Sequence, residues 1–284
     1  FMNSPEFIKP KTKEKTKELE KESQILNVER KDKYKTIDEL FVQSQPSSIY
    51  YTLLVLSVVI VTCGLLLQNA PIVIGGMLVT PILTPILVIS LGISTAELGA
   101  TKGPLILLVK STLFSIVISC VFTLLFGIQD ITQIFVNDLR TAMLYFIVAS
   151  ASGIAATFAW VRKEVSDILP GVAISVSLVP PLSLLGINLG TFSFEYARFY
   201  LIIYFLNLFG IIVGSLIVFS LLKFQKSKKI VKEKVKEVED LKKFKKAKDK
   251  AQKAVEKMEQ VKKNVSEAIE LEEQQQKKKS GQDE

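Results

Sequence analysis

The chain has 284 residues, of which 49% are hydrophobic and 23% charged, and its formal net charge is +8. It contains no histidine, and its two cysteines, Cys63 and Cys120, lie in apolar stretches, so we expect neither a metal site nor a disulfide framework. The sequence also has no nucleotide-binding loop and no Gly-x-Ser-x-Gly segment. We therefore expect no enzymatic activity and no cofactor.

Charged residues divide the chain into three parts. Residues 1–48 and 223–284 are rich in Lys and Glu, whereas residues 49–222 carry only six basic and six acidic side chains. In the N-terminal arm, 1–48, a helix is predicted over 12–41. Because this polar arm precedes the first apolar stretch, we interpret that stretch as a membrane anchor and not as a signal peptide.

The middle part contains six apolar stretches of about 20 residues, the length that a helix needs to cross a bilayer. We predict an all-α membrane protein whose six transmembrane helices lie at 49–68, 71–94, 104–127, 142–161, 168–190 and 199–222.

A Gly-to-Pro motif occurs twice, each time inside a predicted helix. The first copy covers 76–87 and the second covers 171–182, with an offset of 95 residues that aligns Thr80 with Ser175. A proline inside a helix removes a backbone hydrogen bond and clashes with the preceding turn. The motif therefore predicts that both helices are broken.

The same offset of 95 residues carries the first three predicted helices onto the last three. We interpret 49–127 and 142–222 as two repeats. A three-helix unit ends on the opposite side of the membrane from where it began, so the second repeat would be inverted, as in many secondary transporters. The alternative is that apolar helices with scattered Gly and Pro align by chance.

Lys and Arg in short loops favour the cytoplasmic side. They lie in the loops 95–103 and 162–167 and directly after the sixth helix, which are all on one side if six helices alternate. We expect a multi-pass protein of the cell membrane with both termini in the cytoplasm.

The segments 75–87 and 169–182 resemble domain-of-unknown-function family 389, a family of hydrophobic integral membrane proteins of bacteria and archaea. The resemblance covers roughly residues 45–222. Members of the family often have Ser or Gly where this chain has Thr80 and Thr84. The resemblance implies a membrane architecture, and it names no substrate.

Broken helices bring hydroxyl groups and freed backbone groups together, so we interpret the two breaks as a site for a small solute. The candidate binding residues are Thr80, Pro81, Thr84, Pro85, Ser175, Ser177, Pro180, Pro181, Ser183 and Asn188. The alternative is that Ser and Thr only satisfy the backbone at the prolines. Small residues that would let the helices pack closely are Gly75, Gly76, Gly171 and Gly186.

No Asp or Glu lies well inside a predicted helix, which disfavours a mechanism coupled to protons or cations. Lys110 is the one embedded charge. Its long side chain either reaches the cytoplasmic interface or faces the solute path and favours anions. We expect a neutral or anionic solute.

In the C-terminal arm, 223–284, apolar residues recur at spacings of four and three from Ala247 to Ala268, as in a coiled coil. The alternative is a solvated Lys/Glu helix that does not self-associate. The basic cluster Lys223, Lys226, Lys228 and Lys229 suits anionic lipid headgroups. We expect a homo-oligomer that binds no nucleic acid. Its function is either that of a transporter or channel, or that of an oligomeric membrane scaffold.

Overall fold

The computed structural model describes residues 29–127, 139–162 and 178–280, and every regular element among them is a helix. In chain order these are α2 (Arg30–Gln43), α3 (Ser48–Leu66), α4 (Ala70–Val79), α5 (Leu83–Ser94), α6 (Gly99–Phe126), α7 (Leu139–Val161), α9 (Val179–Gly190), α10 (Phe194–Leu221), the short 3₁₀ helix η2 (Phe224–Ser227) and α11 (Lys228–Ser280).

Four helices among the described residues are long and apolar enough to cross a membrane: α3, α6, α10 and the Met143–Val161 part of α7. A fifth candidate is the pair α4 and α5, which is bent by 55°. α9 has only 12 residues, and the first half of the predicted helix at 168–190 lies outside the described residues. The described chain therefore has four or five candidate spans, where six were predicted.

Two predicted starts are wrong. α6 begins at Gly99 and contains Pro104, which was expected to be its first residue, and α10 begins at Phe194 and not at 199. Pro104 is the sixth residue of α6, so its missing N–H leaves the carbonyl of Ala100 without the usual helical hydrogen bond.

The predicted break in the second apolar stretch is confirmed, and Pro81 explains it. Pro81 has no N–H to donate, and the residue before a proline avoids helical geometry. Thr80 is accordingly extended, with φ −71° and ψ 131°. α5 restarts at Leu83, so Pro85 falls in its first turn, where a missing N–H costs no intrahelical bond.

The second pair of prolines also starts a helix. α9 begins at Val179, and Pro180 and Pro181 occupy its first turn. Proline is well suited to this place, because its fixed φ is already helical and the first N–H groups of a helix have no intrahelical partner. These prolines therefore begin α9, whereas the part of the second motif copy before Leu178 lies outside the described residues.

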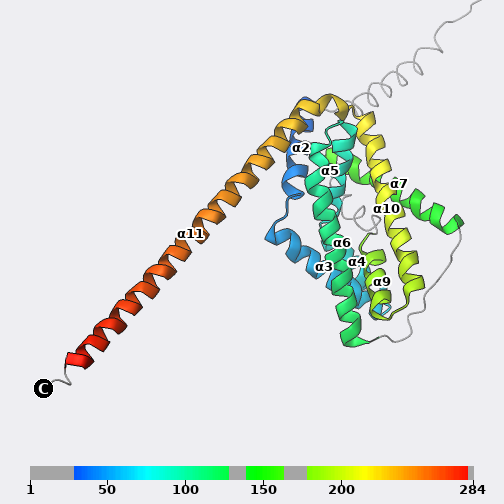
Figure 1. Cartoon of the computed structure of the whole chain (residues 1–284). Coiled ribbons are helices and arrows are strands. Elements are labelled where there is room, and N and C mark those ends of the chain that lie inside the picture. The colour runs from blue at the N-terminus through cyan, green and yellow to red at the C-terminus, as the bar shows by residue number, and fades with distance from the viewer. Residues whose placement is uncertain (1–28, 128–138, 163–177, 281–284) are drawn as a thin grey trace, which may run out of the picture. The chain divides into compact units, whose positions relative to one another are not determined.

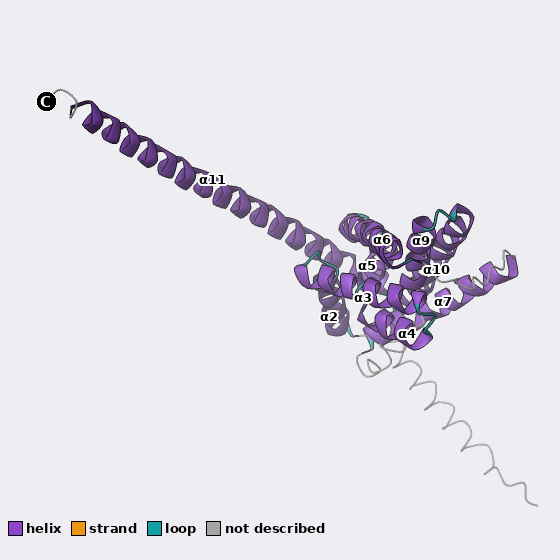
Figure 2. Cartoon of the chain, turned by 90° about the horizontal axis from the view of Figure 1, so that it is seen from below, coloured by secondary structure: helices purple, strands orange, loops and turns teal. Residues whose placement is uncertain are grey.

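The two short helices α5 and α9 form the interior of the fold. Every residue of α5 from Thr84 to Gly92 is buried, and the helix contacts α2, α6, α10 and η2 (Figure 1). α9 packs against α6, α10 and α3, and Figure 2 shows it beside α6 and α10. A helix that is apolar all round has to be enclosed by other elements, as both of these are.

Glycines allow the helices to pack closely. α7 and α10 meet at Gly153, Gly210 and Gly214, and a Cβ at Gly214 would collide with the carbonyl oxygen of Ser150. A Cβ at Gly186 would lie 2.5 Å from the carbonyl oxygen of Ile116 in α6. In lipid, such small residues replace the hydrophobic force that drives packing in water.

Of the four glycines predicted to pack, only Gly76 and Gly186 are seen to do so. A Cβ at Gly76 would lie 2.6 Å from Val61 Cγ2 in α3. Gly75 is exposed, and no described atom lies within 4 Å of an added Cβ, so no packing is seen there among the described residues. Gly171 lies outside the described residues.

Buried hydroxyl groups join the long helices. Tyr50 and Ser111 (O···O 2.9 Å) and Thr62 and Ser119 (2.8 Å) connect α3 to α6. A third pair, Thr112 and Tyr204 (2.7 Å), connects α6 to α10. These directional contacts fix the register of helices whose apolar surfaces alone would allow sliding.

α2 differs from the expectation of a separate N-terminal arm. Its buried residues, Thr36, Ile37, Leu40 and Phe41, form one face, and the helix contacts α5 and α7. It belongs to the first compact unit, which extends to Lys234. The second unit begins at Val235 within α11, so the first turns of that helix also belong with the apolar domain.

Replacing Gly214 with Ala should destabilise the protein by about 1–3 kcal/mol, because the new methyl group overlaps the backbone of α7. The matched control is Gly75→Ala, which adds the same methyl group in open space and should leave the stability unchanged or raise it slightly. Thermal unfolding of both variants in one detergent measures the difference. Equal melting temperatures would show that the α7–α10 contact does not depend on glycine.

Candidate functional site

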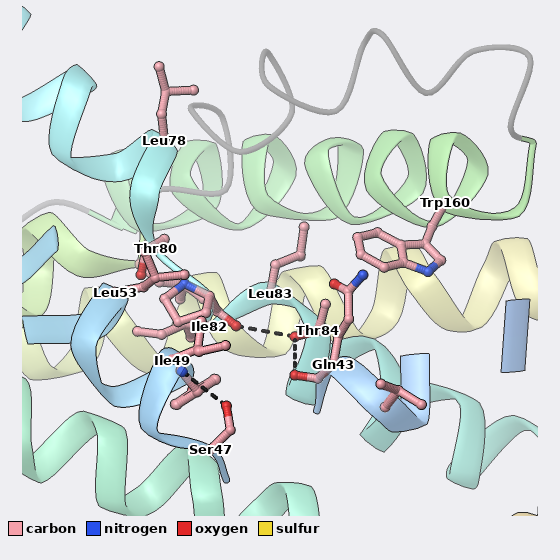
Figure 3. A pocket seen from close by; sticks show the side chains of 14 residues that line it. Gln43, Ser47, Ile49, Leu53, Leu78, Thr80, Ile82, Leu83, Thr84 and Trp160 are labelled. Carbon is pink, nitrogen blue, oxygen red and sulfur yellow. Dashed lines mark hydrogen bonds between the residues drawn. The ribbon is translucent and has the colours of Figure 1, made fainter. Parts of the chain in front are cut away.

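A pocket of about 680 Å³ lies at the break between α4 and α5 (Figure 3). It is bounded by the end of α2, the start of α3, the break itself, the end of α7 and the residue before α9. The lining residues are Val42, Gln43, Ser47, Ile49, Tyr50, Leu53, Leu78, Thr80, Pro81, Ile82, Leu83, Thr84, Trp160 and Leu178.

The pocket joins the two motif copies. Thr80 to Thr84 come from the first copy, and Leu178 comes from the second. Ile82 and Leu178 also belong to one hydrophobic core cluster. The structure thus brings Leu178, two residues before Pro180, to the first break.

Several backbone groups released by the first break have partners. The N–H of Thr80 bonds to Met77 and not to Gly76, and the Ser57 hydroxyl donates to the free Gly76 carbonyl at 2.7 Å. The Thr84 hydroxyl donates to the carbonyl of Pro81 at 3.2 Å. Thr84 therefore satisfies the backbone, which is the structural alternative to a binding role.

Two polar atoms of the pocket residues are buried and have no hydrogen-bond partner among the described residues: Thr80 Oγ1 and Trp160 Nε1. Figure 3 shows these two side chains toward opposite ends of the labelled set. A buried polar group without a partner costs about 1–3 kcal/mol, so both atoms are available to a ligand. The sequence analysis did not select Trp160, because a tryptophan at the end of an apolar stretch is typical of a membrane interface.

Two helices begin at the pocket. Ile82 and Leu178, the residues that precede α5 and α9, both line it. Within the described chain, no side chain caps either helix start. The positive ends of both helix dipoles therefore lie at the pocket, where they favour acceptor groups or negative charge.

The other predicted binding residues lie elsewhere or cannot be placed. Pro85, Pro180 and Pro181 are buried in the first turns of α5 and α9. Ser183 and Asn188 are fully buried within α9 and do not line the pocket, and the Asn188 amide donates to the carbonyl of Leu184 at 2.7 Å. Ser175 and Ser177 lie outside the described residues.

Lys110 does not line the pocket. It lies on an exposed face of α6 beside Ile106, Val109 and Leu113, which are each more than half exposed. The Tyr50–Ser111 hydrogen bond places Lys110 level with the first turn of α3. This position fits the reading in which the side chain reaches the interface, and it gives Lys110 no part in the pocket.

The described residues contain no group of Cys, Asp and Glu that could hold a metal ion. Cys63 and Cys120 are both free thiols, as expected.

The family model described as "Domain of unknown function (DUF389)" matches residues 77–213. Slightly less than half of the chain therefore matches the DUF389 family. The resemblance deduced from the two motif segments is confirmed.

A curated relative, an uncharacterized protein of Methanocaldococcus jannaschii, is 27% identical over 169 residues, which cover 59% of this chain and 52% of the relative. The chain thus spans about half the length of that relative. No solved structure matches the chain.

The DUF389 region supplies only part of the pocket. It contains the break, Trp160 and Leu178, whereas α2 and α3 precede the matched residues and supply the remaining wall. The site is therefore formed between the DUF389 region and the helices that lead into it.

Because Thr80 Oγ1 is buried without a described partner, Thr80→Val should leave the free energy of unfolding unchanged or raise it by up to about 3 kcal/mol. The matched control, Thr62→Val, removes one partner of the 2.8 Å bond to Ser119 and should cost about 1–2 kcal/mol. Thermal unfolding in detergent compares the two. An equal loss in both variants would mean that the Thr80 hydroxyl has a structural partner.

Proposed function

We propose that this chain is a transporter or channel for a small neutral or anionic solute, which binds in the pocket at the α4–α5 break. The observation that carries the proposal is the pocket itself, in which two helix starts meet two buried polar atoms that lack described partners. Broken helices whose ends face a cavity are the usual construction of solute sites in transporters.

The lining supports the solute class. None of the described residues that line the pocket is charged. The Trp160 indole N–H can only donate, the Thr80 hydroxyl can donate, and the helix starts add partial positive charge. An uncharged molecule with an oxygen acceptor, or a small anion, fits this set better than a cation.

The helix bounds support the proposed repeat. Adding 95 to the bounds of α6, Gly99–Phe126, gives those of α10, Phe194–Leu221. The same shift carries α3, Ser48–Leu66, onto the candidate span Met143–Val161, and it carries α5 to within one residue of α9.

The contacts also follow the repeat. α5 packs on α6, as α9 packs on α10, and each short helix also packs on the long helix of the other repeat. Such an exchange is expected of two units related by a twofold axis.

The helix directions favour inversion. α3 runs parallel to α6, because Tyr50 pairs with Ser111 and Thr62 with Ser119. α9 is also parallel to α6, since Gly186 and Gly190 approach successive turns of that helix. α10 follows α9 after a three-residue link and packs against it, so it runs antiparallel to both. This is the relation between the long helices of an inverted repeat.

Three probes of equal size and different charge test the solute class: cyclohexanecarboxamide, cyclohexanecarboxylate and cyclohexylammonium. The amide and the carboxylate should shift the emission of Trp160, the single tryptophan of the chain, and the ammonium should not. Thr80→Val should weaken amide binding about three- to tenfold by removing one hydrogen bond. The exposed Thr52→Val in α3 serves as the control.

Flux into liposomes containing the purified protein then separates transport from binding. Uptake of the probe that binds should fall in Thr80→Val and persist in Thr52→Val. Tighter binding of the ammonium than of the amide, or unchanged uptake by Thr80→Val, would contradict the proposed site.

The second candidate function is an oligomeric membrane scaffold, and α11 favours it. This helix has 53 residues, and its apolar side chains Leu241, Phe244, Met258 and Val261 are each more than half exposed. A long helix with little packing within its own chain gains stability from a partner helix. We propose a second copy of this chain as that partner.

The basic residues Lys223, Lys226, Lys228 and Lys229 are exposed just after α10, where we propose contact with anionic headgroups.

Removing residues 235–284 should reduce the oligomer to a monomer if α11 provides assembly. Light scattering of the detergent-solubilised protein measures the mass of the full chain and of the truncated chain. Probe uptake by the truncated chain distinguishes the two functions, because a transporter retains it. An unchanged oligomeric mass after truncation would contradict assembly through α11.

A further inference from the structure

α2 has one face on the pocket and another on the C-terminal arm. Its last residues, Val42 and Gln43, line the pocket, and the Thr84 hydroxyl lies 3.5 Å from the Gln43 carbonyl oxygen. The buried face of the helix packs against α5 next to the break. Moving α2 would therefore remove a wall of the pocket and break the contacts of this helix with α5 and α7.

Polar contacts hold the outer face of α2 to the segment that follows α10. Asp38 forms an ion pair with Lys234 at 2.6 Å, and the Lys234 side chain is only 12% exposed. Lys33 donates to the carbonyl oxygen of Lys223 at 3.2 Å, and its ammonium group lies 5.3 Å from the centre of the Phe224 ring. We call these contacts the arm clasp.

Positive charges are crowded at the arm clasp. Burial, together with the neighbouring charges of Lys223 and Lys226, lowers the pKa of Lys33. Asp38 supplies a carboxylate to this group of contacts, and it pairs there with Lys234. A change in the charges of the clasp should loosen α2 more than the same change elsewhere on the surface.

The ends of α2 are suited to movement. Within the described chain, no side chain caps the start of the helix at Glu29. A four-residue link that contains Pro46 joins its end to α3. With 14 residues, α2 is near the lower limit for a helix that is stable in water, so its position depends on its contacts.

We propose that α2 is a lid on the pocket and that the arm clasp, through Asp38 and Lys234, holds the lid closed. The C-terminal arm would thereby regulate access to the site from the side on which the two arms meet. The regulatory meaning rests on the proposed function, whereas the lid itself can be tested without a solute.

Trp160 provides the measurement, because it lines the pocket and is the only tryptophan. Acrylamide, an uncharged quencher, reports how accessible the indole is. Asp38→Lys and Lys234→Asp should each raise the quenching constant about twofold or more, and the double swap should return it close to the wild-type value. Raising the salt concentration should increase quenching in the wild type more than in Asp38→Asn, because salt screens the ion pair.

The ion pair Asp240–Lys243 (3.3 Å) in α11 supplies the matched control, since both side chains are about three-quarters exposed. Lys243→Asp introduces the same charge change as Lys234→Asp and should leave quenching unchanged. Asp38→Asn replaces Asp38→Lys if the reversed charge prevents folding, and it should give a smaller rise in the same direction.

Two results would overturn the lid. One is wild-type quenching in both Asp38→Asn and Lys234→Asp, and the other is an equal rise in Lys243→Asp. The outcome is independent of the proposed solute site. Increased quenching with no binding of any probe would leave the lid in place and remove the solute. If probe binding depends on Thr80 but the clasp variants leave quenching unchanged, the solute site is supported and the lid is not.

Discussion

Helices that start with prolines inside a protein need partners for their backbone, and this requirement governs the fold. Pro81 ends the hydrogen-bond ladder of α4, and α5 begins three residues after Thr80 in the most enclosed part of the molecule. The Ser57 hydroxyl and the Thr84 hydroxyl take two of the free carbonyls. The surrounding helices are arranged so that these polar groups never face lipid, where an unsatisfied backbone group is costly.

The long helices meet their neighbours through small and hydroxyl residues. α6 presents serine and threonine to α3 and α9, and α10 presents glycine to α7, while exposed apolar residues such as Leu113 and Phe205 cover other faces. In a bilayer, apolar contact with a neighbouring helix gains little over apolar contact with lipid. Close approach at glycine and directional hydroxyl pairs therefore supply the specificity that a hydrophobic core supplies in water.

The hydrogen-bond partners of the hydroxyl groups indicate where a ligand could bind. The Thr84 hydroxyl already bonds to a backbone carbonyl, and the Thr62 hydroxyl already bonds to another helix. Thr80 Oγ1 and Trp160 Nε1 form no such hydrogen bond with the described residues. Both atoms lie in a neutral pocket next to two helix starts. This position distinguishes candidate binding residues from the other hydroxyl-bearing residues, which the sequence alone does not.

The sequence by itself determined the apolar middle part, the broken helix at Thr80–Pro81, the family and the helix offset of 95 residues. Each of these depends on local chemistry, such as the missing N–H of proline or a run of apolar side chains, and local chemistry can be read along the chain. The sequence did not reveal that α2 belongs to the apolar unit, because three apolar residues in a charged arm, Ile37, Leu40 and Phe41, do not predict burial until α5 is seen to pack against them.

Only the tertiary structure decided which hydroxyls are free, that Lys110 faces outward, that Gly75 packs against nothing described, and that Trp160 lines the pocket. These properties depend on which groups meet across distances of many residues. Hydrogen-bond partners and burial are relations between helices, and no single helix specifies them.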